Sequence, residues 1–120
     1  MAEKAIRISV KQTSIVPQSD IDGTVIVDYP GRFDGVQVNT YVTGTSEQVQ
    51  FVSIGTKKIS FFVRLFLDKN EIGEKNSFNF IAKLEQTNLP KNTSIRFRAA
   101  IIQQHKEVES DVIFVPVVSG

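Results

Sequence analysis

The chain has 120 residues, the usual length of a single domain, so we expect one domain over residues 1–120. Its formal net charge of +1 gives no bulk electrostatic reason to expect nucleic acid or an anionic membrane surface as a partner. It contains no cysteine, which excludes disulfides, thiolate metal sites and cysteine nucleophiles.

The start of the sequence lacks the apolar region of a secretory signal. No apolar run approaches the roughly 18 residues that cross a membrane as a helix. We therefore expect a cytoplasmic domain without a transmembrane segment; the alternative is the mature part of an exported protein, without its signal.

Short stretches in which apolar and polar residues alternate follow one another along the chain, which is typical of half-buried β-strands. We expect strands at residues 5–11, 24–29, 36–43, 48–54, 57–67, 77–84, 95–103 and about 108–118. Gly, Pro, Asn and Asp fill the segments between them and predict turns, among them 16–23 and 68–71. About eight short strands indicate an all-β fold, an antiparallel immunoglobulin-like β-sandwich.

The clearest alternation lies in residues 77–84 and 95–102, two strands joined by a connection that contains Pro90 and Asn92. Each of these strands gives one apolar face to a common core. The predicted core comprises Ile8, Val10, Val25, Val27, Val36, Val38, Phe61, Val63, Leu65, Phe78, Phe80, Phe97, Ala99 and Ile101.

The order of several short motifs resembles the arrestin-like domain family. The motifs are the segment 16–28 with Gly23 at its centre, Gly35-Val36-Gln37-Val38, Gly44, Gly73 followed by Phe78-Asn79-Phe80, and Leu89-Pro90 followed by Ser94. The resemblance covers most of residues 15–103. It implies a sandwich of the arrestin type that acts as a scaffold for proteins or tails, without catalysis.

The chain also departs from that family. Well-known members have two sandwiches in tandem, whereas this chain has room for one. The family's phosphate sensor is a lysine pair on the first strand, where this chain offers only Arg7 and Lys11. We therefore do not extend phosphate sensing to it, and we expect a single-domain, prokaryotic or archaeal relative.

Phe62 and Phe66 flank Arg64 on the outward side of the predicted strand 57–67. Exposed aromatic residues beside arginine are typical of the centres of protein interfaces. The alternative is that another strand or loop of the same chain covers them.

Arg96 and Arg98 lie two residues apart and therefore on one strand face. They could form a basic patch for an acidic or phosphorylated peptide. The alternative is a solvated sheet face, which the balanced net charge favours.

The last predicted strand is apolar on both faces, so we expect it to be central or covered, or, if it is an edge, to pair with another chain. The second case would give a homo-oligomer.

Nothing in the sequence forms a catalytic, cofactor or metal motif. His105 is the one histidine, and we expect it in an exposed turn or at a strand end. Asp20-Ile21-Asp22-Gly23 resembles part of a calcium loop but lacks the remaining oxygen ligands, so a turn is the expected structure.

We therefore expect a non-catalytic adaptor or scaffold that binds a protein or peptide partner through a sheet edge or through Phe62, Arg64, Phe66, Arg96 and Arg98. The alternatives are a structural subunit that assembles by strand pairing, and a loop-based module for calcium or sugar.

Overall fold

A computed structural model describes residues 5–43, 49–55, 57–62, 64–85, 89 and 92–118, with the backbone alone described for residues 57–62. The elements are β1 (Ile6–Val10), β2 (Asp20–Val27), β3 (Gly35–Val42), β4 (Gln50–Ile54), β5 (Lys57–Phe62), β6 (Arg64–Asp68), α1 (Lys69–Ile72), β7 (Ser77–Lys83), β8 (Ser94–Gln103) and β9 (Lys106–Pro116). The all-β prediction is confirmed, apart from the single turn of helix in α1.

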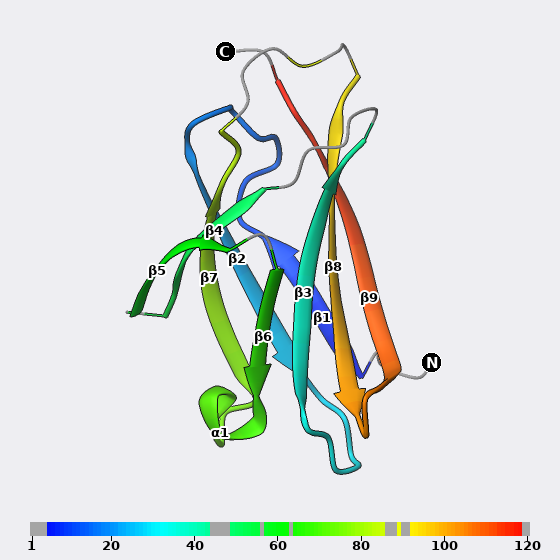
Figure 1. The fold of residues 1–120 in the computed structure, drawn as a ribbon. Coiled ribbons are helices and arrows are strands. Elements are labelled where there is room, and N and C mark those ends of the chain that lie inside the picture. Colours follow the sequence, from blue (N-terminus) through cyan, green and yellow to red (C-terminus); the bar gives the residue numbers. More distant parts are fainter. Residues whose placement is uncertain are drawn as a thin grey trace.

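The strands form two antiparallel sheets that face each other as a sandwich (Figure 1). One sheet has the order β1-β2-β7-β4-β5 and the other the order β6-β3-β8-β9. Because side chains alternate along each strand, every strand buries one set between the sheets and presents the other set outward.

The core lies between these inner faces, largely as predicted. The predicted residues that are buried are Ile8, Val25, Val27, Val36, Val38, Leu65, Phe78, Phe80, Phe97, Ala99 and Ile101. Val10 is only partly buried against this cluster. The predictions for Phe61 and Val63 fall on side chains outside the described part of the chain.

The prediction of one strand over residues 57–67 is wrong. β5 is an edge of the five-stranded sheet, whereas β6 is an edge of the four-stranded sheet. Both sheets bury one face in the same core, so a chain that passes from one sheet to the other can keep its alternation of apolar and polar residues. The pattern therefore carries no sign of the change of sheet.

Two predicted turns also differ from the structure. β2 already begins at Asp20, so Asp20, Asp22 and Gly23 lie in a strand paired with β7. Residues 68–71 form the start of α1, where a capping box closes the first turn. In this box Glu71 N–H donates to Asp68 Oδ1 at 2.8 Å and Asp68 N–H donates to Glu71 Oε1 at 3.2 Å.

β9 is an edge of its sheet, but neighbouring segments occupy part of its length. Ile15 N–H donates to the carbonyl of Pro116 at 2.8 Å, and Val118 N–H donates to the carbonyl of Ile15 at 2.9 Å. Further along, Ile8 N–H of β1 donates to Asp111 Oδ2 at 3.0 Å. The edges β1 and β9 of the two sheets are therefore joined along this side of the sandwich.

Asp111 is buried in this seam, and its carboxylate accepts a backbone N–H that β2 does not use. We expect Asp111→Ala to lower the free energy of unfolding by about 1–3 kcal/mol, because it removes an acceptor from a buried donor. Urea unfolding followed by circular dichroism measures this change. Ser110→Ala is the matched control, since Ser110 is exposed on the same strand and its loss should have little effect. Equal midpoints for the two variants would contradict the role given to Asp111.

No helix in the described part of the chain is long and apolar enough to cross a membrane.

Candidate functional site

The outer face of the four-stranded sheet gathers aromatic and arginine side chains from all four of its strands. We name it the arginine–aromatic face; its members are Arg64, Phe66, Tyr41, Arg96, Arg98, Val112 and Phe114. The aromatic side chains are far more exposed than core residues are, at 41% for Tyr41, 51% for Phe66 and 61% for Phe114.

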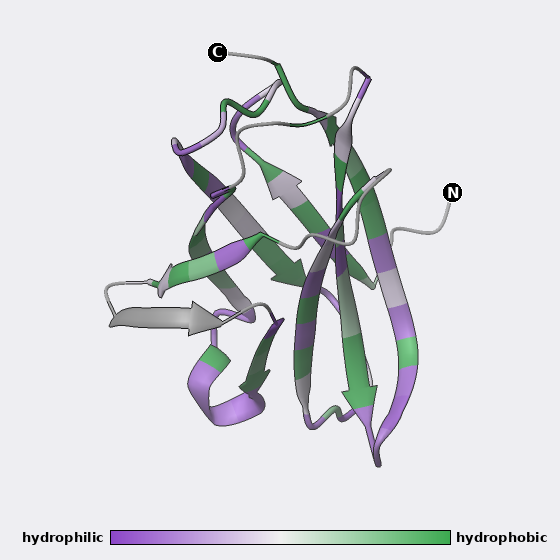
Figure 2. Ribbon diagram, turned by 45° about the horizontal axis from the view of Figure 1, so that its top comes forward, coloured by the Kyte–Doolittle hydropathy of each residue, from purple (hydrophilic) through white to green (hydrophobic). Residues whose placement is uncertain are grey.

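The strand register fixes which of these residues are neighbours. Tyr41 of β3 lies opposite Arg96 of β8, and Arg96 lies opposite Phe114 of β9. One step along the sheet, Arg98 lies between Asn39 of β3 and Val112 of β9. The apolar part of β9 is its C-terminal part, whereas its first half is largely hydrophilic (Figure 2).

Arg96 stands between two aromatic residues. Its guanidinium carbon lies 5.6 Å from the centroid of the Tyr41 ring, which is cation–π geometry. Its Nε–H is covered and has no hydrogen-bond partner among the described residues. Arg96 is therefore held by stacking and retains an unused donor.

The charges on this face do not balance. Arg98 forms an ion pair with Glu107 of β9. Neither Arg96 nor Arg64 has a carboxylate partner among the described residues. The face therefore carries a net positive charge beside its aromatic rings.

Phe66 is seated on a glycine. A Cβ atom built on Gly35 of β3 would lie 2.5 Å from the carbonyl oxygen of Leu67 and 2.6 Å from Phe66 Cζ, so glycine is required by the close approach of the β6 backbone and also leaves room for the ring. The ring covers the Gly35 backbone, and half of its surface still faces solvent. Phe66 thus packs on the β3 backbone while presenting an aromatic surface to solvent.

The outer face of the five-stranded sheet is different in character. Thr24 Oγ1 bonds to Asn79 Oδ1 at 2.9 Å, and Lys83 pairs with Asp20 at 3.9 Å. Its polar groups thus satisfy one another across the strands, as on an ordinary solvated face. The contrast shows that the arginine–aromatic face is not simply what an exposed sheet of this chain looks like.

The structure brings together four of the five residues that the sequence indicated, namely Arg64, Phe66, Arg96 and Arg98. Phe62 does not join them, because it belongs to β5 in the other sheet, and its side chain lies outside the described part of the chain. The expectation that Phe62 and Phe66 share one strand face is therefore wrong.

Sequence reasoning missed Tyr41 and Phe114 as members of this face. The alternation placed Tyr41 on the polar side of its strand, whereas the last predicted strand is apolar on both faces and gave no side to Phe114. Only the strand order β3-β8-β9 shows that they flank Arg96.

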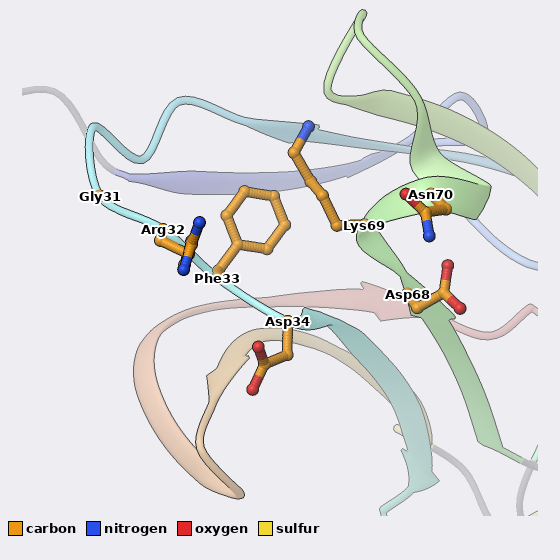
Figure 3. A pocket seen from close by; sticks show the side chains of 7 residues that line it. All are labelled: Gly31, Arg32, Phe33, Asp34, Asp68, Lys69 and Asn70. Carbon is orange, nitrogen blue, oxygen red and sulfur yellow. The ribbon is translucent and has the colours of Figure 1, made fainter.

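A hollow of about 530 Å³ lies beside α1, between Gly31–Asp34 and Asp68–Asn70 (Figure 3). Lys69 Nζ donates to the carbonyl of Gly73 at 3.2 Å and lies 5.4 Å from the centroid of the Phe33 ring. The Asp34 carboxylate accepts the N–H of Gln104 at 2.7 Å. These charged groups hold the corner of the fold together and are already engaged.

The residues considered for calcium or acid–base chemistry are also engaged in the fold. Asp22 Oδ2 accepts from Gln12 Nε2 at 3.0 Å, and Asp22 N–H donates to Gln12 Oε1 at 2.9 Å. Within the described ranges, no three His, Cys, Asp or Glu side chains are grouped to hold a metal ion. His105 lies with Gln104 in the β8–β9 hairpin turn, both with positive φ, as expected for an exposed turn.

No protein-family model matches the chain, and no curated protein matches it in sequence. Several solved structures match its fold. A reeler domain of human F-spondin aligns over 95% of this chain and 93% of its own length, with 11% identity and a TM-score of 0.63. AvmM, which catalyzes macrocyclization in alchivemycin A biosynthesis, aligns over 98% of this chain and 91% of its own, with 7% identity and a TM-score of 0.58.

A self-complemented form of MyfA, the major subunit of Myf fimbriae from Yersinia enterocolitica, also matches. It aligns over 93% of this chain and 97% of its own length, with 16% identity and a TM-score of 0.50. At such identities the likeness shows the fold alone, a two-sheet β-sandwich. The arrestin type stays a prediction, because none of these three structures is an arrestin.

Proposed function

We propose that this chain is a non-catalytic interaction domain that binds a protein or peptide through its arginine–aromatic face. The observation that supports the proposal is the row Tyr41, Arg96 and Phe114, in which two exposed rings flank an arginine on a rigid sheet. Aromatic residues and arginine are enriched at the centres of protein interfaces, and tyrosine and arginine are prominent among the residues that contribute most to the binding energy.

The proposal retains the adaptor function expected from the sequence but assigns it to a different set of surface residues. Phe62 drops out of the predicted set, while Tyr41 and Phe114 enter it. An arrestin-like relationship and a cytoplasmic location are compatible with this function and remain proposals.

The proposal is tested by quantitative affinity capture from the source organism with three baits. The wild-type domain is compared with Phe114→Ser and with Ile26→Ser, which removes an exposed apolar residue (38% exposed) from the outer face of the other sheet. We expect proteins that the wild type enriches to be lost with Phe114→Ser and kept with Ile26→Ser. A set of captured proteins that is identical for all three baits would contradict the proposed surface.

Self-assembly is the second candidate, and the likeness to a fimbrial subunit favours it. In the described part of the chain, however, the contacts of β9 with Ile15 and with Ile8 through Asp111 occupy part of the edge at which another strand would have to pair. Assembly by strand addition at β9 would have to displace these contacts. Light scattering after size exclusion decides between the candidates, since a monomer at high concentration removes the structural subunit.

The calcium- or sugar-binding alternative required a loop around Asp20 and Asp22, and these residues are not in a loop. Asp20 and Asp22 lie in β2, where Asp20 pairs with Lys83 and Asp22 with Gln12. We do not propose it further.

A further inference from the structure

The arginine–aromatic face also indicates the chemistry of its partner, and this inference rests on the proposed function. Three arginines contribute to the face, and the one ion pair described on it joins Arg98 to Glu107. Arg96 adds a covered Nε–H without an acceptor among the described residues. Buried N–H groups in proteins are nearly always paired, so an acceptor from a partner would complete this arrangement.

We propose that the partner presents an extended segment with carboxylate side chains at alternate positions, which Arg96 and Arg98 bind. The two arginines are two residues apart on one strand, and this spacing is roughly 7 Å. Alternate side chains of an extended peptide have the same spacing, so two carboxylates at i and i+2 match the two guanidinium groups. Arg98 keeps its pair with Glu107 through Nη2, and a carboxylate of the segment binds its remaining N–H groups. Adjacent carboxylates at i and i+1 would point to opposite sides of the peptide and could not both bind.

The surroundings of the arginine pair extend this match. Beyond Arg98 along β8, the next residue on this side of the strand is Ala100. Ala100 lies opposite Gln37 of β3, and Gln37 lies opposite Phe66 of β6. The register row formed by Phe66, Gln37, Ala100 and Ser110 contains no charged residue. Ala100 itself is buried, so an apolar side chain at i+4 of the bound segment would lie over Gln37 and reach toward Phe66.

Arg64 widens the positive surface on the far side of β3. It lies opposite Asn39, which in turn lies opposite Arg98, so the two arginines are separated by two strand spacings, or roughly 10 Å. It attracts the segment at long range without competing for the same carboxylate. Binding should weaken as salt is added, because exposed charges are screened within about 10 Å at moderate ionic strength.

Three synthetic peptides test the spacing. The first is Ser-Glu-Ser-Glu-Ser-Leu-Ser, the second is Ser-Glu-Glu-Ser-Ser-Leu-Ser with the same composition, and the third replaces both Glu residues of the first by Lys. Each peptide is titrated into the labelled protein and followed by nuclear magnetic resonance. We expect saturable shifts at the Nε–H of Arg96 and Arg98 with the first peptide only, while Thr24 and Asn79 on the opposite sheet stay unchanged.

Arg96→Gln and Arg7→Gln form the matched pair of variants, since each removes one arginine from an outer face. We expect Arg96→Gln to weaken the first peptide by about tenfold, the usual effect of losing a charge-assisted hydrogen bond. Arg7→Gln, on the opposite sheet, should leave its affinity unchanged. Equal affinities for the first two peptides, or an equal loss in both variants, would overturn the proposal in favour of bulk charge attraction.

The outcomes also separate this inference from the proposed function. If no peptide binds while Phe114→Ser still abolishes capture, the face is an interface but its partner is not acidic. The remaining possible occupant of the face is a second copy of this chain. Sedimentation of the free protein at the concentration used in the titration tests for such a dimer. A concentration-dependent dimer that shifts the same Arg96 and Arg98 signals would assign the face to a second copy of this chain and overturn the proposal.

Discussion

Replacing Phe80 by aspartate is expected to leave the domain unfolded at room temperature. Phe80 is 1% exposed, and its ring meets that of Phe51 edge-to-face, with centroids 5.4 Å apart. Loss of a buried phenylalanine costs about 3–5 kcal/mol, and an unpaired carboxylate in its place adds a further desolvation cost. The sum reaches the roughly 5–15 kcal/mol that a whole domain has as its free energy of unfolding. Far-ultraviolet circular dichroism and urea titration measure the result.

Phe114→Asp is the control, because it makes the same chemical change on the outer face, where the ring is 61% exposed. It should fold and unfold at nearly the urea concentration of the wild type. A cooperative transition of Phe80→Asp at the wild-type midpoint would show that Phe80 is not in the core.

The strands could be predicted because a half-buried strand has a period of two that survives in the sequence. The same period of two does not reveal that β5 and β6 are separate strands, since the inward positions of both sheets are apolar. Leu65 and Leu67 are buried as the alternation predicted, yet they lie in a different sheet from β5. Sheet membership depends on pairing between distant segments, on which a local pattern has no bearing.

For the candidate site, the outward orientation of several residues could be predicted from the sequence, but their grouping on one face could not. Residue type and alternation placed Arg96, Arg98 and Phe66 outward, and the structure agrees. Their proximity to Tyr41 and Phe114 depends on β3, β8 and β9 being neighbours in the sheet, and four strands and α1 lie between β3 and β8 in the sequence. Phe62 was grouped with Phe66 because residues 57–67 were predicted to form one strand, which the structure divides into β5 and β6.

Gly23 illustrates a misleading local signal. In sequence it stands with Asp20 and Asp22 in what is typical turn chemistry. In the structure it is a buried strand residue opposite Phe80 of β7, and the Phe80 ring covers it. The glycine is needed for the close approach of a ring and not for a turn.

This close approach leads to the second large effect, a destabilisation of about 1–3 kcal/mol by Gly23→Ala from overpacking. A Cβ atom at this position would lie 2.1 Å from Phe80 Cζ and 2.4 Å from Cε2, well inside van der Waals contact. The ring cannot retreat freely, since Phe51 packs against it. Urea unfolding of the variant measures the loss.

A double-mutant cycle shows whether the ring is the cause. In a Phe80→Leu background the atoms that clash are gone, so Gly23→Ala should cost about 1 kcal/mol less than in the wild type. Thr24→Ala is the control, because Thr24 follows Gly23 but points outward to Asn79, and its effect should be the same in both backgrounds. If Gly23→Ala costs equally much with and without the ring, the strain lies in the β2 backbone, and the requirement for glycine at this position has a different origin.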